Sequence, residues 1–123
     1  MGLTRRGFAD VLARADVVVG LAGTANEQAA GLGRVVVAFP RSGVQYTRRF
    51  ALRQKRLLGD ALVLVEGPEQ AAQEVARLLD APDERRRRGE TGRERMGPPG
   101  ATQRIVAMLD RVLGLCPDCP KAE

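Results

Sequence analysis

The fold is decided by residues 16–40, DVVVGLAGTANEQAAGLGRVVVAFP, which predict a βαβ unit. Residues 17–19 and 35–39 are unbroken apolar runs, and parallel strands that helices cover on both faces have this appearance in a sequence. The turn at residues 21–24 leads from the first strand into a helix. The first N–H groups of such a helix lack backbone partners, and α/β proteins often bind a phosphate there.

Gly31 and Gly33 follow this helix, so we interpret them as its termination and the return into the second strand, not as phosphate-binding glycines. Residues 41–44, RSGV, then form a loop at the carboxyl end of the second strand, where open α/β sheets bind ligands.

The remaining elements alternate as an α/β fold requires. We expect helices at residues 3–15, 45–58, 68–80 and 101–113, and a third buried strand at 61–65. Thr4 is the expected N-cap of the first helix and Gly59 ends the second. Ala72, Val75 and Leu79, with Ala71 and Leu78 beside them, are the expected inner face of the helix at 68–80.

The segment from Asp83 to Arg95 is charged and contains Gly89 and Gly92. We interpret its run of four arginines, residues 85–88, as a solvated face with acidic neighbours. The net charge of +5 raises the question of nucleic-acid binding. The basic residues are spread along helices and aromatic residues make up only 3% of the chain, so we expect no nucleic-acid partner.

With 123 residues, the chain predicts one α/β domain at 1–115, three-layered and Rossmann-like, and a flexible polar tail at 116–123. Because aromatic residues are scarce, the core must consist of Val, Leu and Ala. No apolar run approaches the roughly 20 residues that cross a bilayer, and none of signal-peptide length follows Arg5 and Arg6. We therefore expect a cytoplasmic protein without a transmembrane segment.

Several motifs together resemble the C-terminal, donor-binding half of GT-B glycosyltransferases. The resemblance extends over most of residues 8–113 and is strongest to the lipid-A-disaccharide synthases and the related peptidoglycan N-acetylglucosaminyltransferases. The motifs that carry it are ADVVV at 15–19, GTANEQAA at 23–30, GLG at 31–33, the strand at 35–40 and Gln45-Tyr46.

This resemblance implies a site for a nucleotide-diphosphate sugar of the UDP type. Gly23 and Thr24 would approach the diphosphate, Glu27 would accept hydrogen bonds from the ribose hydroxyls, and Gln45 would lie near the sugar or the pyrophosphate. Glycine, helix-start N–H groups and a carboxylate suit these roles chemically. Thr24 and Glu27 also fit a capping box that needs no ligand, and Gln45 and Tyr46 fit a helix start.

The 123 residues contain nothing that resembles the N-terminal domain of the family or the first strands of its C-terminal domain. In the family, that missing half supplies the acceptor site and the general base. The chain has no histidine, which excludes Ser-His and Cys-His mechanisms, and no pair of carboxylates stands out by its spacing. We therefore assign no catalytic residue and no cofactor.

Cys116 and Cys119 form a C-x-x-C pair after the last expected helix. A zinc site needs four ligands, and the chain has no further cysteine. The pair is either incidental or half of a four-cysteine zinc site shared by two chains, and we predict no metal site in the chain itself.

Two functional hypotheses follow. The chain is either the nucleotide-sugar-binding half of a glycosyltransferase-like protein, which needs a partner chain for transfer, or a non-catalytic oligomerising domain. If the strands are the fourth to sixth of the order 3-2-1-4-5-6, the strand at 16–20 becomes an exposed edge. We therefore predict a homodimer that uses this edge, the helix at 101–113, or both.

Overall fold

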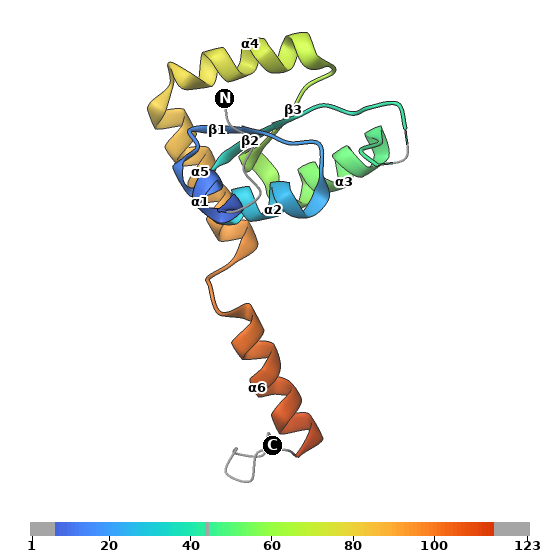
Figure 1. Ribbon diagram of the computed structural model, residues 1–123, viewed down its shortest axis with the longest axis vertical. Coiled ribbons are helices and arrows are strands. Elements are labelled where there is room, and N and C mark those ends of the chain that lie inside the picture. The colour runs from blue at the N-terminus through green and yellow to red at the C-terminus, as the bar shows by residue number, and fades with distance from the viewer. Residues whose placement is uncertain (1–6, 44, 115–123) are drawn as a thin grey trace.

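The computed structural model describes residues 7–43 and 45–114 and shows an α/β chain with an open, parallel, three-stranded sheet (Figure 1). The strands are β1 (Val17–Val19), β2 (Val35–Ala38) and β3 (Leu62–Leu64), in the spatial order β1-β2-β3. Val17 pairs with Val35, and Val36 pairs with Leu62. The predicted βαβ unit is confirmed, and β1 lies at an edge of this sheet. The third strand is also present but is shorter than the predicted 61–65, and of its three residues only Leu62 is buried.

The central strand β2 is completely buried, which explains its unbroken apolar sequence. Val36 and Ala38 pack on one side of the sheet, in a cluster that includes Leu58. Val35 and Val37 pack on the other side, with Ala71 and Leu78. Since valines and alanines fill both layers, the core contains few aromatic residues, as expected.

Helices cover both faces of the sheet. One face carries α1 (Phe8–Arg14), α2 (Gly23–Gly31) and α3 (Arg48–Leu58), and the other carries α4 (Pro68–Leu79). A short 3₁₀ helix, η1 (Gly59–Ala61), joins α3 to β3, while α5 (Pro82–Met96) and α6 (Ala101–Leu113) follow α4.

Two helix boundaries differ from the prediction for local reasons. The helix expected from residue 45 begins at Arg48, because Thr47 is its N-cap and accepts a hydrogen bond from the Phe50 N–H at 3.3 Å. Gly59 ends this helix at a positive φ of 59°, as expected. The first helix begins at Phe8 with Gly7 as its N-cap, and the expected cap Thr4 lies outside the described residues.

The inner face of α4 is shifted by one residue from the predicted one. Ala71 and Leu78 are buried and Val75 is half-buried, whereas Ala72 and Leu79 are exposed. Both sets have helical spacing, so the periodicity alone cannot distinguish them. The packing of α4 against Val35 and Val37 selects the set around Leu78.

Helix α5 closes the amino ends of the strands. It is continuous although it contains Gly89 and Gly92, and both glycines are buried. A Cβ atom at Gly89 would lie 2.1 Å from the Gly33 carbonyl oxygen, and one at Gly92 would lie 2.5 Å from that of Ala30. Glycine therefore permits a close approach of α5 to the end of α2.

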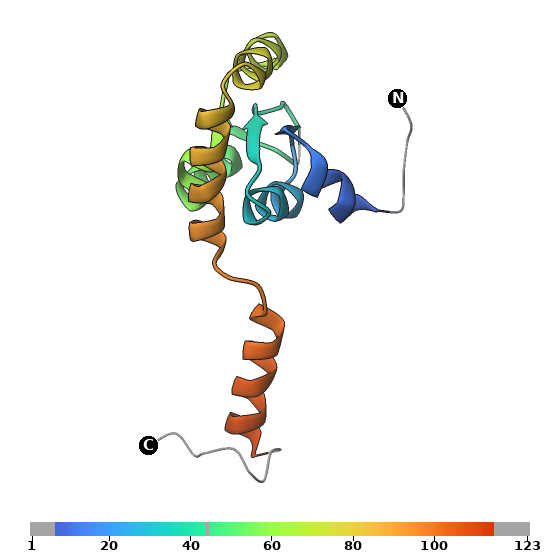
Figure 2. The same ribbon diagram turned by 90° about the vertical axis from the view of Figure 1, so that its left-hand side faces the viewer.

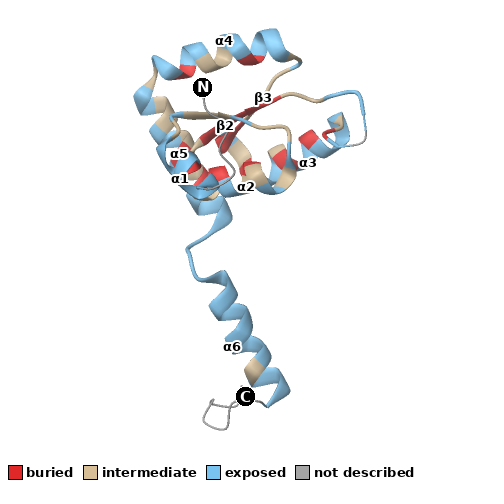
Figure 3. Cartoon of the chain, in the orientation of Figure 1, coloured by how far each residue is buried: buried red, intermediate tan, exposed pale blue. Residues whose placement is uncertain are grey.

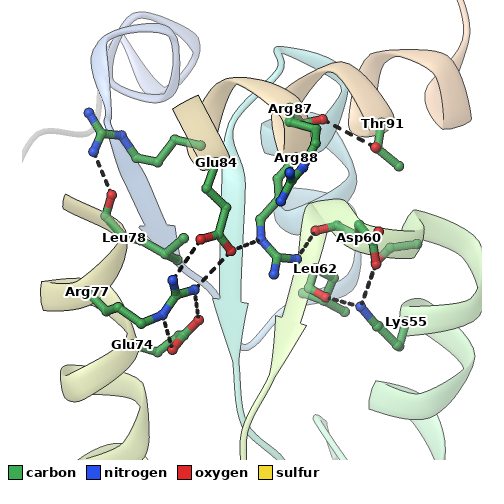
Figure 4. A network of polar contacts seen from close by, with 12 residues as sticks. Lys55, Asp60, Leu62, Glu74, Arg77, Leu78, Glu84, Arg87, Arg88 and Thr91 are labelled. Carbon is green, nitrogen blue, oxygen red and sulfur yellow. Dashed lines mark hydrogen bonds and ion pairs between the residues drawn. The ribbon is translucent and has the colours of Figure 1, made fainter. Parts of the chain in front are cut away.

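The interpretation of residues 85–88 as a solvated face is wrong for two of the four arginines. The side chains of Arg85 and Arg88 are only 20% and 21% exposed. Arg85 donates to the carbonyl oxygens of Leu78 and Leu79 at the end of α4. Arg88 donates to the carbonyl oxygen of Asp60 before β3 (Figure 4). These two arginines hold α5 against its neighbours.

Helix α6 extends away from the rest of the chain after residues 97–100 (Figures 1 and 2). It has no buried residue, and Ile105, Met108, Leu109 and Val112 are between 51% and 76% exposed (Figure 3). The predicted apolar stripe is thus present without a partner among the described residues. None of the described helices has the length and apolar character that crossing a membrane requires.

Candidate functional site

The carboxyl edge of the sheet contains two neighbouring shallow depressions. They have volumes of about 360 and 390 Å³ and share Leu21, Arg41 and Ser42 in their linings. The first is also lined by Gln45 and Tyr46, and the second extends to Glu66 and Pro68 after β3. Ligands of open α/β sheets bind at this edge, so the depressions are the candidate site.

The structure places the four predicted site residues in two groups. Gln45 is exposed and lines the first depression beside Leu21, which follows β1. Gly23 and Thr24 are the first two residues of α2, and Glu27 lies one turn further along, half-buried. These three residues are not part of the lining of either depression.

The capping-box interpretation of Thr24 and Glu27 is wrong. The N-cap of α2 is Ala22, in an extended conformation, and no side chain caps this helix. Thr24 lies two residues inside the helix, where its hydroxyl group is past the capping position. The start of α2 therefore does not require the Thr24 hydroxyl or the Glu27 carboxylate.

Gly23 has a packing role. A Cβ atom at this position would lie 3.0 Å from Cζ of Phe50, so the absence of a side chain lets α3 pack against the start of α2. The backbone N–H groups that precede Asn26 in α2 lack partners within the helix, and they form its positive end.

A buried polar network lies directly behind this edge. Asn26, Tyr46 and Gln54 are each at most 3% exposed. Gln54 Nε2 donates to the Gly23 carbonyl oxygen at 2.9 Å, which orients Gln54 Oε1 toward the other two side chains. That oxygen accepts from Asn26 Nδ2 and from the Tyr46 hydroxyl, both at 2.8 Å. Burial raises the pKa of Tyr46, although the hydrogen bond with Asn26 opposes this effect.

The network connects every segment that forms the first depression. Asn26 Nδ2 also donates to the Gly20 carbonyl oxygen after β1, at 3.2 Å. The backbone N–H of Arg41 donates to the carbonyl oxygen of Tyr46 at 2.9 Å and closes the loop between them. The end of β1, the start of α2 and this loop are therefore held together through the Asn26, Tyr46 and Gln54 side chains.

The sequence analysis did not identify Asn26 or Gln54, although a signal was present. Asn26 shares helical spacing with the buried Ala29 and Ala30, and Gln54 shares it with Ala51 and Leu58. A polar residue at an inner position of an apolar face must find buried hydrogen-bond partners, and two such residues on consecutive helices can supply each other.

The described residues provide no metal centre. Within residues 7–43 and 45–114, no three or more His, Cys, Asp or Glu residues are grouped so that they could hold a metal ion. Cys116 and Cys119 lie outside the described residues, so their pairing remains a prediction from the sequence.

No family model matches this chain, and neither a curated protein nor a solved structure shows significant similarity to it.

Proposed function

We propose that the chain is the nucleotide-diphosphate-sugar-binding half of a glycosyltransferase-like protein of the GT-B type and is catalytically incomplete alone. The observation that carries this proposal is the position of Gln45 and Arg41. Both line a depression at the carboxyl end of β1, immediately before the start of α2. A sugar nucleotide needs such a combination of an anion-binding helix start and polar side chains for hydroxyl groups.

Each part of the ligand has a chemically suitable group in this proposal. The positive end of α2 and the exposed Thr24 hydroxyl would donate to a phosphate, and the exposed guanidinium group of Arg41 would neutralise its charge. Glu27 would accept from the ribose hydroxyls, and Gln45 would contact the sugar. We place this binding in the cytoplasm, with UDP as the nucleotide.

The proposal assigns no transfer activity to the chain alone. The depressions at the carboxyl edge are shallow, and their linings contain no nucleophile paired with a base. Without an opposing wall, water is not excluded and an acceptor is not positioned. A partner chain that resembles the N-terminal half of the family would supply both, and the isolated chain should transfer no sugar from any donor.

Titration calorimetry with UDP tests the proposal. We expect weak binding that Glu27→Ala, Gln45→Ala and Arg41→Ala each reduce. Glu90→Ala and Gln103→Ala are matched controls, because these residues are exposed on α5 and α6. No binding up to millimolar UDP, or equal binding by the Glu27→Ala variant, would show that the donor-site assignment is wrong.

The alternative function, a non-catalytic oligomerising domain, is favoured by two exposed apolar surfaces. The apolar stripe of α6 is exposed, and Val19 at the β1 edge is 54% exposed. A free helix of 13 residues is marginally stable in water, so α6 gains stability if its stripe is covered. A homodimer would cover it, and a specific interface needs roughly 800 Å² from each partner.

Light scattering at micromolar concentration tests this alternative. We expect a dimer that Leu109→Lys dissociates, whereas Gln103→Lys, on the same helix, leaves it intact. A wild-type monomer under these conditions would exclude self-association through α6 and the β1 edge.

A further inference from the structure

Helix α3 presents an outward face that is strongly basic. The helix contains five basic residues and no acidic one. Ala51, Gln54 and Leu58 point into the core, while four exposed arginines occupy the opposite face. Arg48, Arg49, Arg53 and Arg56 surround Leu52, and the five side chains border a hollow of about 560 Å³.

This face is not neutralised by the chain itself. Arg48 forms an ion pair with Glu66 at 3.0 Å. Within the part of the chain that the structure describes, Arg49, Arg53 and Arg56 form no ion pair. Helix α5, by contrast, carries four acidic residues beside its six arginines, and three of these arginines, Arg85, Arg86 and Arg88, have a carboxylate partner. The net positive charge of α3 is therefore higher than that of α5.

The exposed apolar residues of α3 indicate which kind of anion suits this face. Leu52 and Leu57 are each 47% exposed, and Phe50 is 39% exposed. Leucines among arginines fit a surface that offers phosphates and, directly below them, hydrocarbon. Exposed leucines contribute little to the binding of a nucleic-acid phosphate backbone. The chain also has few aromatic residues that could stack on bases.

We propose that the outer face of α3 adsorbs to a membrane surface that contains anionic phospholipids. Arg49, Arg53 and Arg56 bind the headgroup phosphates, and Leu52 and Leu57 enter the boundary between headgroups and acyl chains. The attachment is peripheral, since the remaining face of α3 stays in the protein core. None of these α3 residues lines the depressions of the proposed nucleotide site.

Co-sedimentation with vesicles tests the proposal. The probe is phosphatidylcholine vesicles with and without phosphatidylglycerol, at low and at high salt. We expect the chain to bind only the vesicles with phosphatidylglycerol and to dissociate as salt screens the charges. The triple variant Arg49→Gln/Arg53→Gln/Arg56→Gln should bind about a hundredfold more weakly, because each basic residue near an anionic surface contributes about a fivefold change.

Two matched variants identify the cause of any loss. Arg87→Gln/Arg93→Gln/Arg95→Gln on α5 also removes three exposed arginines that join no ion pair in the described structure, away from the proposed surface, and should reduce binding far less. Leu52→Ser keeps every charge and should still weaken vesicle binding severalfold, since an apolar contact is lost. All substituted side chains are exposed, so circular dichroism and thermal unfolding should match those of the wild type.

Three outcomes would overturn the proposal. The first is an absence of vesicle binding at low salt, and the second is an equal loss in the α3 and α5 charge variants. The third is duplex nucleic acid binding that is at least as tight as vesicle binding, is abolished in the α3 triple variant and is insensitive to Leu52→Ser. That result would assign the face to nucleic acid.

Discussion

The amino ends of the three strands are covered by a helix, whereas their carboxyl ends are open to solvent. We call these two sides of the sheet the amino edge and the carboxyl edge. At the amino edge, α5 contacts the residues that precede each strand. Arg85 pairs with Asp16 before β1, Gly89 lies against Gly33 before β2, and Arg88 bonds to Asp60 before β3. At the carboxyl edge, no helix of the described chain covers the residues that follow the strands in this way, and shallow depressions remain there.

The two edges are held together in different ways. At the amino edge the backbones of α5 and its neighbours lie close together, and at the carboxyl edge buried side chains connect the segments by hydrogen bonds. Helix α5 lies close to the carbonyl oxygens of Gly33 and Ala30 because its inner residues Gly89 and Gly92 have no side chains. The segments of the carboxyl edge are instead connected by Asn26, Tyr46 and Gln54. Substitutions at each edge should therefore differ in mechanism and in size.

Gly92→Ala should have the largest effect, because its Cβ would meet the carbonyl oxygen of Ala30 and neither backbone can move easily. We expect the free energy of unfolding to fall by about 3 kcal/mol in urea denaturation. Gly31→Ala is the control. A Cβ atom at Gly31 would lie 3.5 Å from Met96, which is an ordinary contact. Since alanine has a higher helix propensity than glycine, the free energy of unfolding should stay the same or rise by up to about 1 kcal/mol. Equal stability of the two variants would mean that α5 is not closely packed on α2.

Gln54→Leu should have an intermediate effect at the open edge. The substitution leaves Asn26 Nδ2, the Tyr46 hydroxyl and the Gly23 carbonyl oxygen without their shared partner, at nearly constant side-chain volume. Because buried polar groups lose hydrogen-bond partners, we expect the free energy of unfolding to fall by about 2 kcal/mol. Gln73→Leu, at an exposed position of α4, should change the unfolding free energy by less than about 0.5 kcal/mol. A Gln54→Leu variant as stable as the wild type would contradict a structural role of the network.

The central strand β2 could be predicted because its environment is uniform. Buried on both faces, β2 needs apolar residues at every position, and the run at residues 35–39 has no other simple explanation. The unit at 16–40 and the terminating Gly33, which adopts a φ of 77°, followed from the same local rules.

The role of α5 could not be predicted because its inner face carries no apolar signal. Arg85, Arg88, Gly89 and Gly92 have the helical spacing of an inner face, but periodicity analysis counts arginine as polar and glycine as a helix breaker. The structure shows why these residue types are suitable. The carbonyl groups at the end of α4 accept hydrogen bonds from Arg85, and the backbone of α2 leaves room only for glycine at position 92. For the same reason, the packing partner of Gly23 could not be predicted from residues 21–24 alone.

The smallest expected effect concerns the ion pairs that join α5 to α4. Arg77 donates to both carboxylate oxygens of Glu84, and Arg88 donates to one of them (Figure 4). These hydrogen bonds, that of Arg77 first, lower the pKa of Glu84 to about 2. A carboxyl group with a lowered pKa in the folded state stabilises the protein above its unfolded pKa. This contribution is lost as the pH falls through the folded value.

Wild-type stability should therefore decrease between pH about 4.5 and about 2 in part through Glu84, and Glu84→Gln should make this decrease less steep. The change should be small, because the Arg77 side chain is 48% exposed and solvent and salt screen its ion pair with Glu84. Urea midpoints measured across this pH range, at low and high salt, provide the comparison. Glu90→Gln is the matched control, since in the described structure this exposed α5 carboxylate joins no ion pair. If Glu84→Gln and Glu90→Gln show the same pH dependence, the ion pair between Glu84 and Arg77 does not contribute to the attachment of α5 to α4.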